Sequence, residues 1–64
     1  MKYILEFYVD GELDTVRESN DKIPLYPSKS DLVDIGEGLH RVQEVHLVYP
    51  FDGTVKIKVF LEKV

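Results

Sequence analysis

Two histidines, His40 and His46, are the side chains best suited to bind a metal ion or to carry a proton in catalysis. In an extended strand these two positions point to the same side but lie about 20 Å apart, at about 3.3 Å per residue, which is too far for one metal ion. A bulge between them would place them on opposite faces. Glu44 adds a single carboxylate. The sequence therefore predicts two ordinary histidines on a polar face and no metal site.

No other set of residues forms a motif for catalysis or for cofactor binding. Gly36-Glu37-Gly38 lacks the third glycine and the downstream Lys-Ser/Thr of a phosphate-binding loop. The acidic residues Asp31, Asp34 and Glu37 do not have the ligand spacing of a calcium loop. The serines have no nucleophile motif around them and stand in turn-like segments, at Ser19, Ser28 and Ser30. We expect a protein that is not an enzyme and uses no cofactor.

The charge balance limits the classes of partner. Eight basic and twelve acidic side chains give a net charge of −4, whereas a nucleic-acid-binding protein normally carries a basic face. No apolar run approaches the roughly 20 residues that span a bilayer, and Glu6 comes too early for a secretory signal. The absence of cysteine excludes disulfides and cysteine-ligated zinc. We expect a cytoplasmic protein, with neither a membrane nor nucleic acid as its main partner.

The strongest structural signal is the segment from Thr54 to Val64. Apolar residues alternate there with charged ones, and the apolar positions are Val55, Ile57, Val59 and Leu61. An unbroken period of two with β-branched residues predicts a strand that buries one face. The rest of the chain must supply the strands that pair with it.

A second strand is predicted over Lys2–Val9, and the Asp10-Gly11 that follows is typical of a hairpin turn. A two-residue loop would set Phe7 opposite Asp14. A three-residue loop of residues 9–11 would instead pair Phe7 with Leu13 and keep one face apolar, so this register is preferred. The returning strand is then expected over Glu12–Glu18.

The segment Ile23–Pro27 alternates apolar residues with prolines. Because proline has no N–H, this segment is predicted to be extended but not to be a central strand. We expect it to cross the core with Ile23, Leu25 and Tyr26 turned inward. Pro24 and Pro27 also have the PxxP spacing of a ligand for aromatic grooves, but the apolar flanks favour packing within the domain.

Residues 28–49 permit two interpretations. Apolar residues recur there every three or four positions, as in an amphipathic helix, which would cover about residues 30–46 of an α+β domain. Gly36 and Gly38 disfavour a helix and favour a turn. The preferred interpretation has a short strand over Asp31–Ile35 and a long one over Leu39–Tyr49. Val42 and Val45 can then both face inward only if a bulge lies near Gln43-Glu44.

The run LYPSKSDLVDIGEGLHRVQEVHLVY, followed by a turn and VKIKVFLE, resembles small β-barrels of the Src-homology-3-like fold found in short bacterial and phage proteins. In those barrels a proline leads into a polar turn, a short strand, and a longer strand with two valines three apart. Ser30-Asp31 stands where they usually carry Gly-Asp. The resemblance implies an all-β, five-stranded antiparallel, partly closed barrel over residues 1–64, and it implies no particular function.

Three apolar side chains fall on strand faces that are otherwise charged, namely Ile4, Tyr8 and Phe60. If the first and last strands pair, these residues could meet in one exposed patch, unless the segment Ile23–Pro27 covers Phe60. Exposed apolar patches often mark interfaces. The sequence therefore favours a small binding or adaptor module that contacts a protein partner, or a second copy of itself, through this patch.

The alternative function is a nucleic-acid-associated small barrel. Lys56 and Lys58 would supply a local basic stripe beside the aromatic residues, which is the combination that binds single-stranded nucleic acid.

Overall fold

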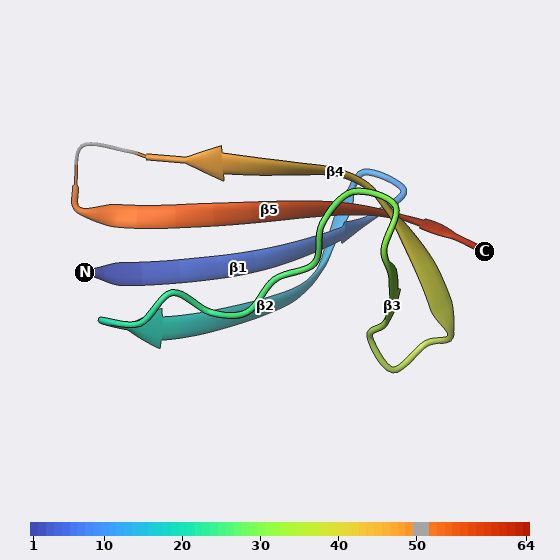
Figure 1. Cartoon of the computed structure of the whole chain (residues 1–64), viewed down its shortest axis with the longest axis horizontal. Coiled ribbons are helices and arrows are strands. Elements are labelled where there is room, and N and C mark those ends of the chain that lie inside the picture. Colours follow the sequence, from blue (N-terminus) through green and yellow to red (C-terminus); the bar gives the residue numbers. More distant parts are fainter. Residues whose placement is uncertain (50–51) are drawn as a thin grey trace.

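Five strands form one curled sheet in the computed structural model, which describes residues 1–49 and 52–64 (Figure 1). The strands are β1 (Lys2–Val9), β2 (Glu12–Asn20), β3 (Leu32–Asp34), β4 (Leu39–Val48) and β5 (Thr54–Lys63). The described residues contain no helix. The all-β prediction is therefore confirmed, and the alternative helix over residues 30–46 is wrong.

The sheet has the strand order β2-β1-β5-β4-β3, so β1 and β5 pair at its centre. This central pair is parallel, while the other three pairs are antiparallel. The sheet is thus predominantly antiparallel, but the parallel central pair corrects the expectation of an antiparallel barrel. The reason is geometric, because five strands that alternate in direction leave the first and the last pointing the same way.

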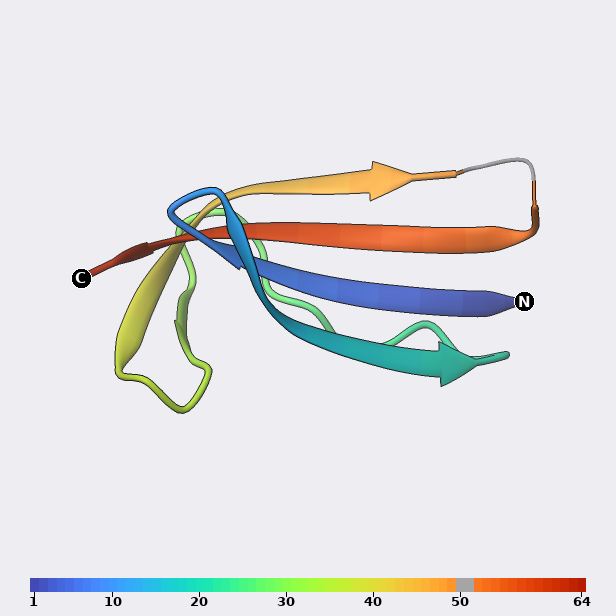
Figure 2. The same cartoon turned by 180° about the vertical axis from the view of Figure 1, so that it is seen from behind.

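The edge strands β2 and β3 do not pair with each other in the described part of the chain, so the sheet curls without closing (Figure 2). The result is an open half-barrel. It is compatible with a Src-homology-3-like fold at the level of fold class, and the parallel central pair departs from the barrel that the resemblance implied.

The β1–β2 hairpin corrects the predicted register. Val9 pairs with Glu12, so the loop has two residues, Asp10 and Gly11, with φ angles of 51° and 81°. The register then shifts between Phe7 and Tyr8, because Asp14 is an extra residue in β2. Without the bulge, a two-residue turn would place Asp14 opposite Phe7. With it, Thr15 lies opposite Phe7, so no acidic residue pairs with the apolar face. The expected three-residue loop and Phe7–Leu13 pair are wrong.

The bulge predicted in β4 is confirmed. Val42 pairs with Leu61 and Glu44 pairs with Phe60, which leaves Gln43 as the extra residue. Val42 is buried and Val45 packs against the same core. The irregularity therefore lets two valines three positions apart face the same side.

The core lies on one face of the sheet, and its buried apolar side chains come mainly from the two central strands. They are Leu5, Phe7, Val42, Val55, Ile57, Val59 and Leu61. The segment of residues 21–31 crosses this face in front of the strands in Figure 1 and behind them in Figure 2. We call this the inner face and the opposite one the outer face.

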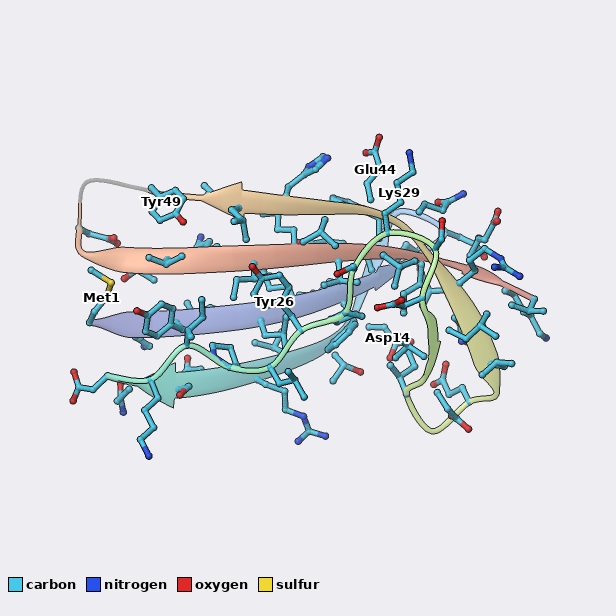
Figure 3. All side chains as sticks on the ribbon, in the orientation of Figure 1. Met1, Asp14, Tyr26, Lys29, Glu44 and Tyr49 are labelled. Atoms are coloured by element: carbon cyan, nitrogen blue, oxygen red, sulfur yellow. The ribbon has the colours of Figure 1, made fainter. Side chains whose placement is uncertain are left out.

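The crossing segment is oriented differently from the prediction. Tyr26 is half-buried, packs against the core and lies over the middle of the sheet (Figure 3), whereas Leu25 is 97% exposed and Ile23 is mostly exposed. In an extended segment neighbouring residues point to opposite sides. Tyr26 has the larger apolar surface to bury, and its inward position turns Ile23 and Leu25 outward.

Candidate protein-binding surface

The outer face consists of cross-strand rows of side chains from the three middle strands. In one row, Tyr8 of β1 pairs with Phe60 of β5, which in turn pairs with Glu44 of β4. The next row contains Glu6, Lys58 and His46, and the one after it Ile4, Lys56 and Val48. Apolar and charged side chains therefore alternate across this face.

An aromatic cluster of Tyr8, His46 and Phe60 lies at the centre of the outer face. The rings of Tyr8 and Phe60 stack with centroids 5.0 Å apart and an interplanar angle of 20°. The His46 ring lies 4.8 Å from the Phe60 ring and is tilted by 57°. The parallel register of β1 and β5 produces the first contact, and the bulge at Gln43 produces the second by turning His46 to the outer face.

Charged side chains surround the aromatic cluster. The Tyr8 hydroxyl donates a hydrogen bond of 3.0 Å to Glu6 Oε1, and His46 Nε2 lies 3.0 Å from Glu44 Oε2. Lys58 Nζ lies 5.9 Å from the centre of the Tyr8 ring. Partial burial raises the pKa of the Tyr8 hydroxyl, and the hydrogen bond to Glu6 and its negative charge raise it further. Tyr8 is therefore a neutral donor near pH 7.

The structure brings two of the three predicted site residues together. Tyr8 and Phe60 stack, but Ile4 pairs with Lys56 and lies four positions along β1 from Tyr8. The segment Ile23–Pro27 does not cover Phe60, because it crosses the inner face. All three predicted side chains are half-buried within the sheet surface.

The two histidines have different environments. His46 is exposed on the outer face as predicted, but His40 is only 3% exposed on the inner face, with Nδ1 3.1 Å from the Gly38 carbonyl oxygen. The prediction of a polar-face position is therefore wrong for His40. The bulge at Gln43 separates the two side chains onto opposite faces, and no group of three or more potential metal ligands gathers among the described residues.

A hollow of about 430 Å³ adjoins the aromatic cluster and is lined by Gly11, Gln43, Glu44 and Phe60. It lies where the β1–β2 turn and the β4 bulge flank the same stretch of β5. Gln43 Nε2 donates a hydrogen bond of 3.0 Å to Glu62 Oε2. No single segment of the sequence indicates this hollow, because it forms only where the β1–β2 turn and the β4 bulge lie side by side.

A second hollow of about 430 Å³ lies on the inner face, beside the crossing segment. Its walls are mostly apolar and come from Phe7, Leu25, Tyr26, Pro27, Asp31 and Val33. Part of the PxxP segment thus packs within the domain, with Pro24, Tyr26 and Pro27 half-buried.

Comparisons with protein-family models, curated proteins and solved structures found no match to this chain. Within residues 1–49 and 52–64 there is no helix with the length and hydrophobicity needed to cross a membrane.

Proposed function

We propose that this protein is a small non-enzymatic binding or adaptor module that contacts a protein partner, or a second copy of itself, through the outer face of its sheet. Tyr8 and Phe60 form the centre of the contact. The observation that carries the proposal is the aromatic cluster of Tyr8, His46 and Phe60 on the face that the crossing segment leaves uncovered.

The composition of the outer face suits a protein interface. Aromatic residues are enriched at the centres of interfaces, and polar residues at the rim. Exposed apolar side chains extend the cluster on both sides, since Leu13 pairs with Tyr8, Val16 pairs with Glu6, and Val48 lies in the row of Ile4. The face therefore offers apolar area that a partner could bury, and charges that could fix its orientation.

The same face gives less support to nucleic-acid binding. Lys56 and Lys58 do point outward, and Lys58 lies over the Tyr8 ring. Four carboxylates, those of Glu6, Glu18, Glu44 and Glu62, lie at positions of the same face and would repel phosphates.

The variant Phe60→Ser tests the proposal. We expect a loss of stability of about 1–3 kcal/mol, because the variant removes the aromatic pair and also part of the buried apolar surface of a half-buried side chain, together with a large loss of self-association or partner binding. Thermal melts measure the first effect. Sedimentation equilibrium measures self-association, and capture from an extract followed by calorimetry with the purified partner measures partner binding.

Leu25→Ser is the matched control, because it removes an exposed apolar side chain from the segment that crosses the other face. It should leave association unchanged. If Phe60→Ser lowers the melting temperature strongly and leaves association as it was, the outer face is not the interface. Retention of nucleic acid at low salt, which Lys58→Ala abolishes, would favour the nucleic-acid alternative instead.

A further inference from the structure

The hollow beside Phe60 has walls of three chemical kinds. Phe60 provides an aromatic ring, Glu44 a carboxylate and Gln43 a carboxamide. The wall formed by Gly11 is not obstructed by other side chains, since a Cβ built at Gly11 would meet no atom within 4 Å. The hollow is therefore a shallow, accessible depression with an aromatic wall and polar groups beside it.

The polar groups of the hollow mainly accept hydrogen bonds. Glu44 has two carboxylate oxygens, of which Oε2 contacts His46. The amide nitrogen of Gln43 donates a hydrogen bond to Glu62, so a second carboxylate lies next to Gln43 and the carbonyl oxygen of Gln43 remains an acceptor. A ligand for this hollow must therefore donate hydrogen bonds, and a positive charge complements the two carboxylates and the net charge of −4.

A guanidinium group satisfies these conditions better than an ammonium group. It is planar and stacks on aromatic rings, and its fork of N–H donors matches a carboxylate. An ammonium group is more strongly hydrated and cannot stack in this way.

We infer that the hollow formed by Gly11, Gln43, Glu44 and Phe60 binds an arginine side chain presented by the partner protein. The guanidinium pairs with the Glu44 carboxylate and lies against the part of the Phe60 side chain that Tyr8 and His46 leave accessible in the hollow, while the aliphatic part of the side chain lies toward the apolar cluster. This inference rests on the proposed function, because it names the chemical group that the outer face recognises.

Nuclear magnetic resonance titration with N-acetyl-arginine amide tests the inference on the intact protein. The probe should move the backbone amide signals of Gly11, Gln43, Glu44 and Phe60 along a saturating curve. N-acetyl-citrulline amide has the same shape without the charge and should bind about tenfold more weakly, as expected when a charge-assisted hydrogen bond becomes a neutral one. N-acetyl-lysine amide should also bind more weakly than the arginine probe.

Two variants of equal net charge locate the site. Glu44→Gln should weaken binding of the arginine probe by about tenfold. Glu18→Gln removes the same charge from β2, on the outer face but away from the hollow, and should leave the affinity unchanged. Equal binding of the arginine and citrulline probes, equal effects of the two variants, or signals that move elsewhere would each overturn the inference.

The proposed function and this inference fail separately. If Phe60→Ser abolishes association while the arginine probe does not bind, the interface stands and the arginine site is wrong. If the arginine probe binds at the hollow and Phe60→Ser leaves association unchanged, the site is real and the proposed interface is wrong.

Discussion

Ile57 shows most directly how one residue supports the fold. Its side chain is fully buried in the central strand β5, while the neighbouring Lys56 points to the outer face. We expect Ile57→Ala to lower the free energy of unfolding by about 2–5 kcal/mol and Lys56→Ala to lower it by less than about 0.5 kcal/mol. Urea unfolding measures both values.

A small domain has little stability to lose, so Ile57→Ala could leave no folded protein to measure. Ile57→Val then serves in its place, with an expected loss of about 0.5–1.5 kcal/mol. Similar losses for the variants at positions 56 and 57 would contradict the facing of β5.

Two exposed aspartates make stability depend on pH in the acid range. A hydrogen bond from the N-terminal ammonium group, 2.9 Å from Asp21 Oδ1, lowers the pKa of Asp21, and its positive charge lowers it further. A hydrogen bond from the Thr54 backbone N–H lowers the pKa of Asp52. Both carboxylates thus hold their protons less tightly in the folded state than in the unfolded state.

The stabilisation from these groups is therefore present above the unfolded pKa of about 3.9 and is lost as the pH falls through the lower folded pKa. We expect the urea midpoint to fall progressively below about pH 4. Asp21→Asn and Asp52→Asn should each make the fall shallower, and a pH series of urea melts measures it. An unchanged slope in both variants would contradict this origin of the acid sensitivity.

The residues of the candidate site were only partly predictable. The alternation of β1 and β5 was enough to place Tyr8 and Phe60 on the outer face, and pairing of these strands was enough to bring them together. The contribution of His46 does not follow from alternation, because His46 reaches Phe60 only through the bulge at Gln43, which turns it to the outer face. His40 was misplaced for a related reason, since the same bulge turns the first part of β4 over and buries His40 on the inner face.

At the scale of elements, the turn between β1 and β2 requires positive φ angles at both of its residues, Asp10 and Gly11. Gly11 has a φ of 81°, in the region that favours glycine, and no atom lies near an added Cβ. Gly11→Ala should therefore cost about 1 kcal/mol through backbone conformation alone. Thermal melts measure the loss.

Asp10→Asn is the matched control for the turn. Asparagine also tolerates the positive φ that Asp10 adopts, so stability should change by no more than about 0.5 kcal/mol. A Gly11→Ala variant as stable as this control would mean that the turn does not need a left-handed residue at position 11.

The register of this hairpin shows why some elements escape prediction. A regular two-residue hairpin would pair apolar Phe7 with acidic Asp14, which indicates that the hairpin is irregular. Either a longer loop or a bulge would avoid this pair. In β4, Val42 and Val45 are three positions apart and both face the core, and only a bulge between them permits this. In β2 the sequence is compatible with either a longer loop or a bulge. The positive φ angles of Asp10 and Gly11 show that the turn has two residues, so the bulge is required.

At the scale of the whole molecule, the position of the first and last strands decides the architecture. Sequence periodicity predicted four of the strands nearly within their bounds, and the short β3 approximately. It did not predict the parallel pair, because periodicity shows which face a strand buries and not which way its neighbour runs. The direction follows instead from the number of strands, because the first and fifth of five strands that alternate in direction run the same way.

The same parallel pair has a consequence for how the protein folds. Lys2 lies beside Thr54 and Val9 beside Leu61, so the central ladder joins segments that are far apart in sequence. A pairing of this kind gives no free energy until a long loop has closed, and topologies dominated by such pairings fold slowly, in about milliseconds to seconds. Stopped-flow refolding should show one phase in this range.

Neither outer hairpin can bury its apolar residues alone, because each presents them to a core that exists only when β1 meets β5. We therefore expect the folding transition state to contain this central contact already. Truncations in β1 or β5, such as Leu5→Ala and Val59→Ala, should slow folding, while changes in the edge strand β2 should mainly speed unfolding.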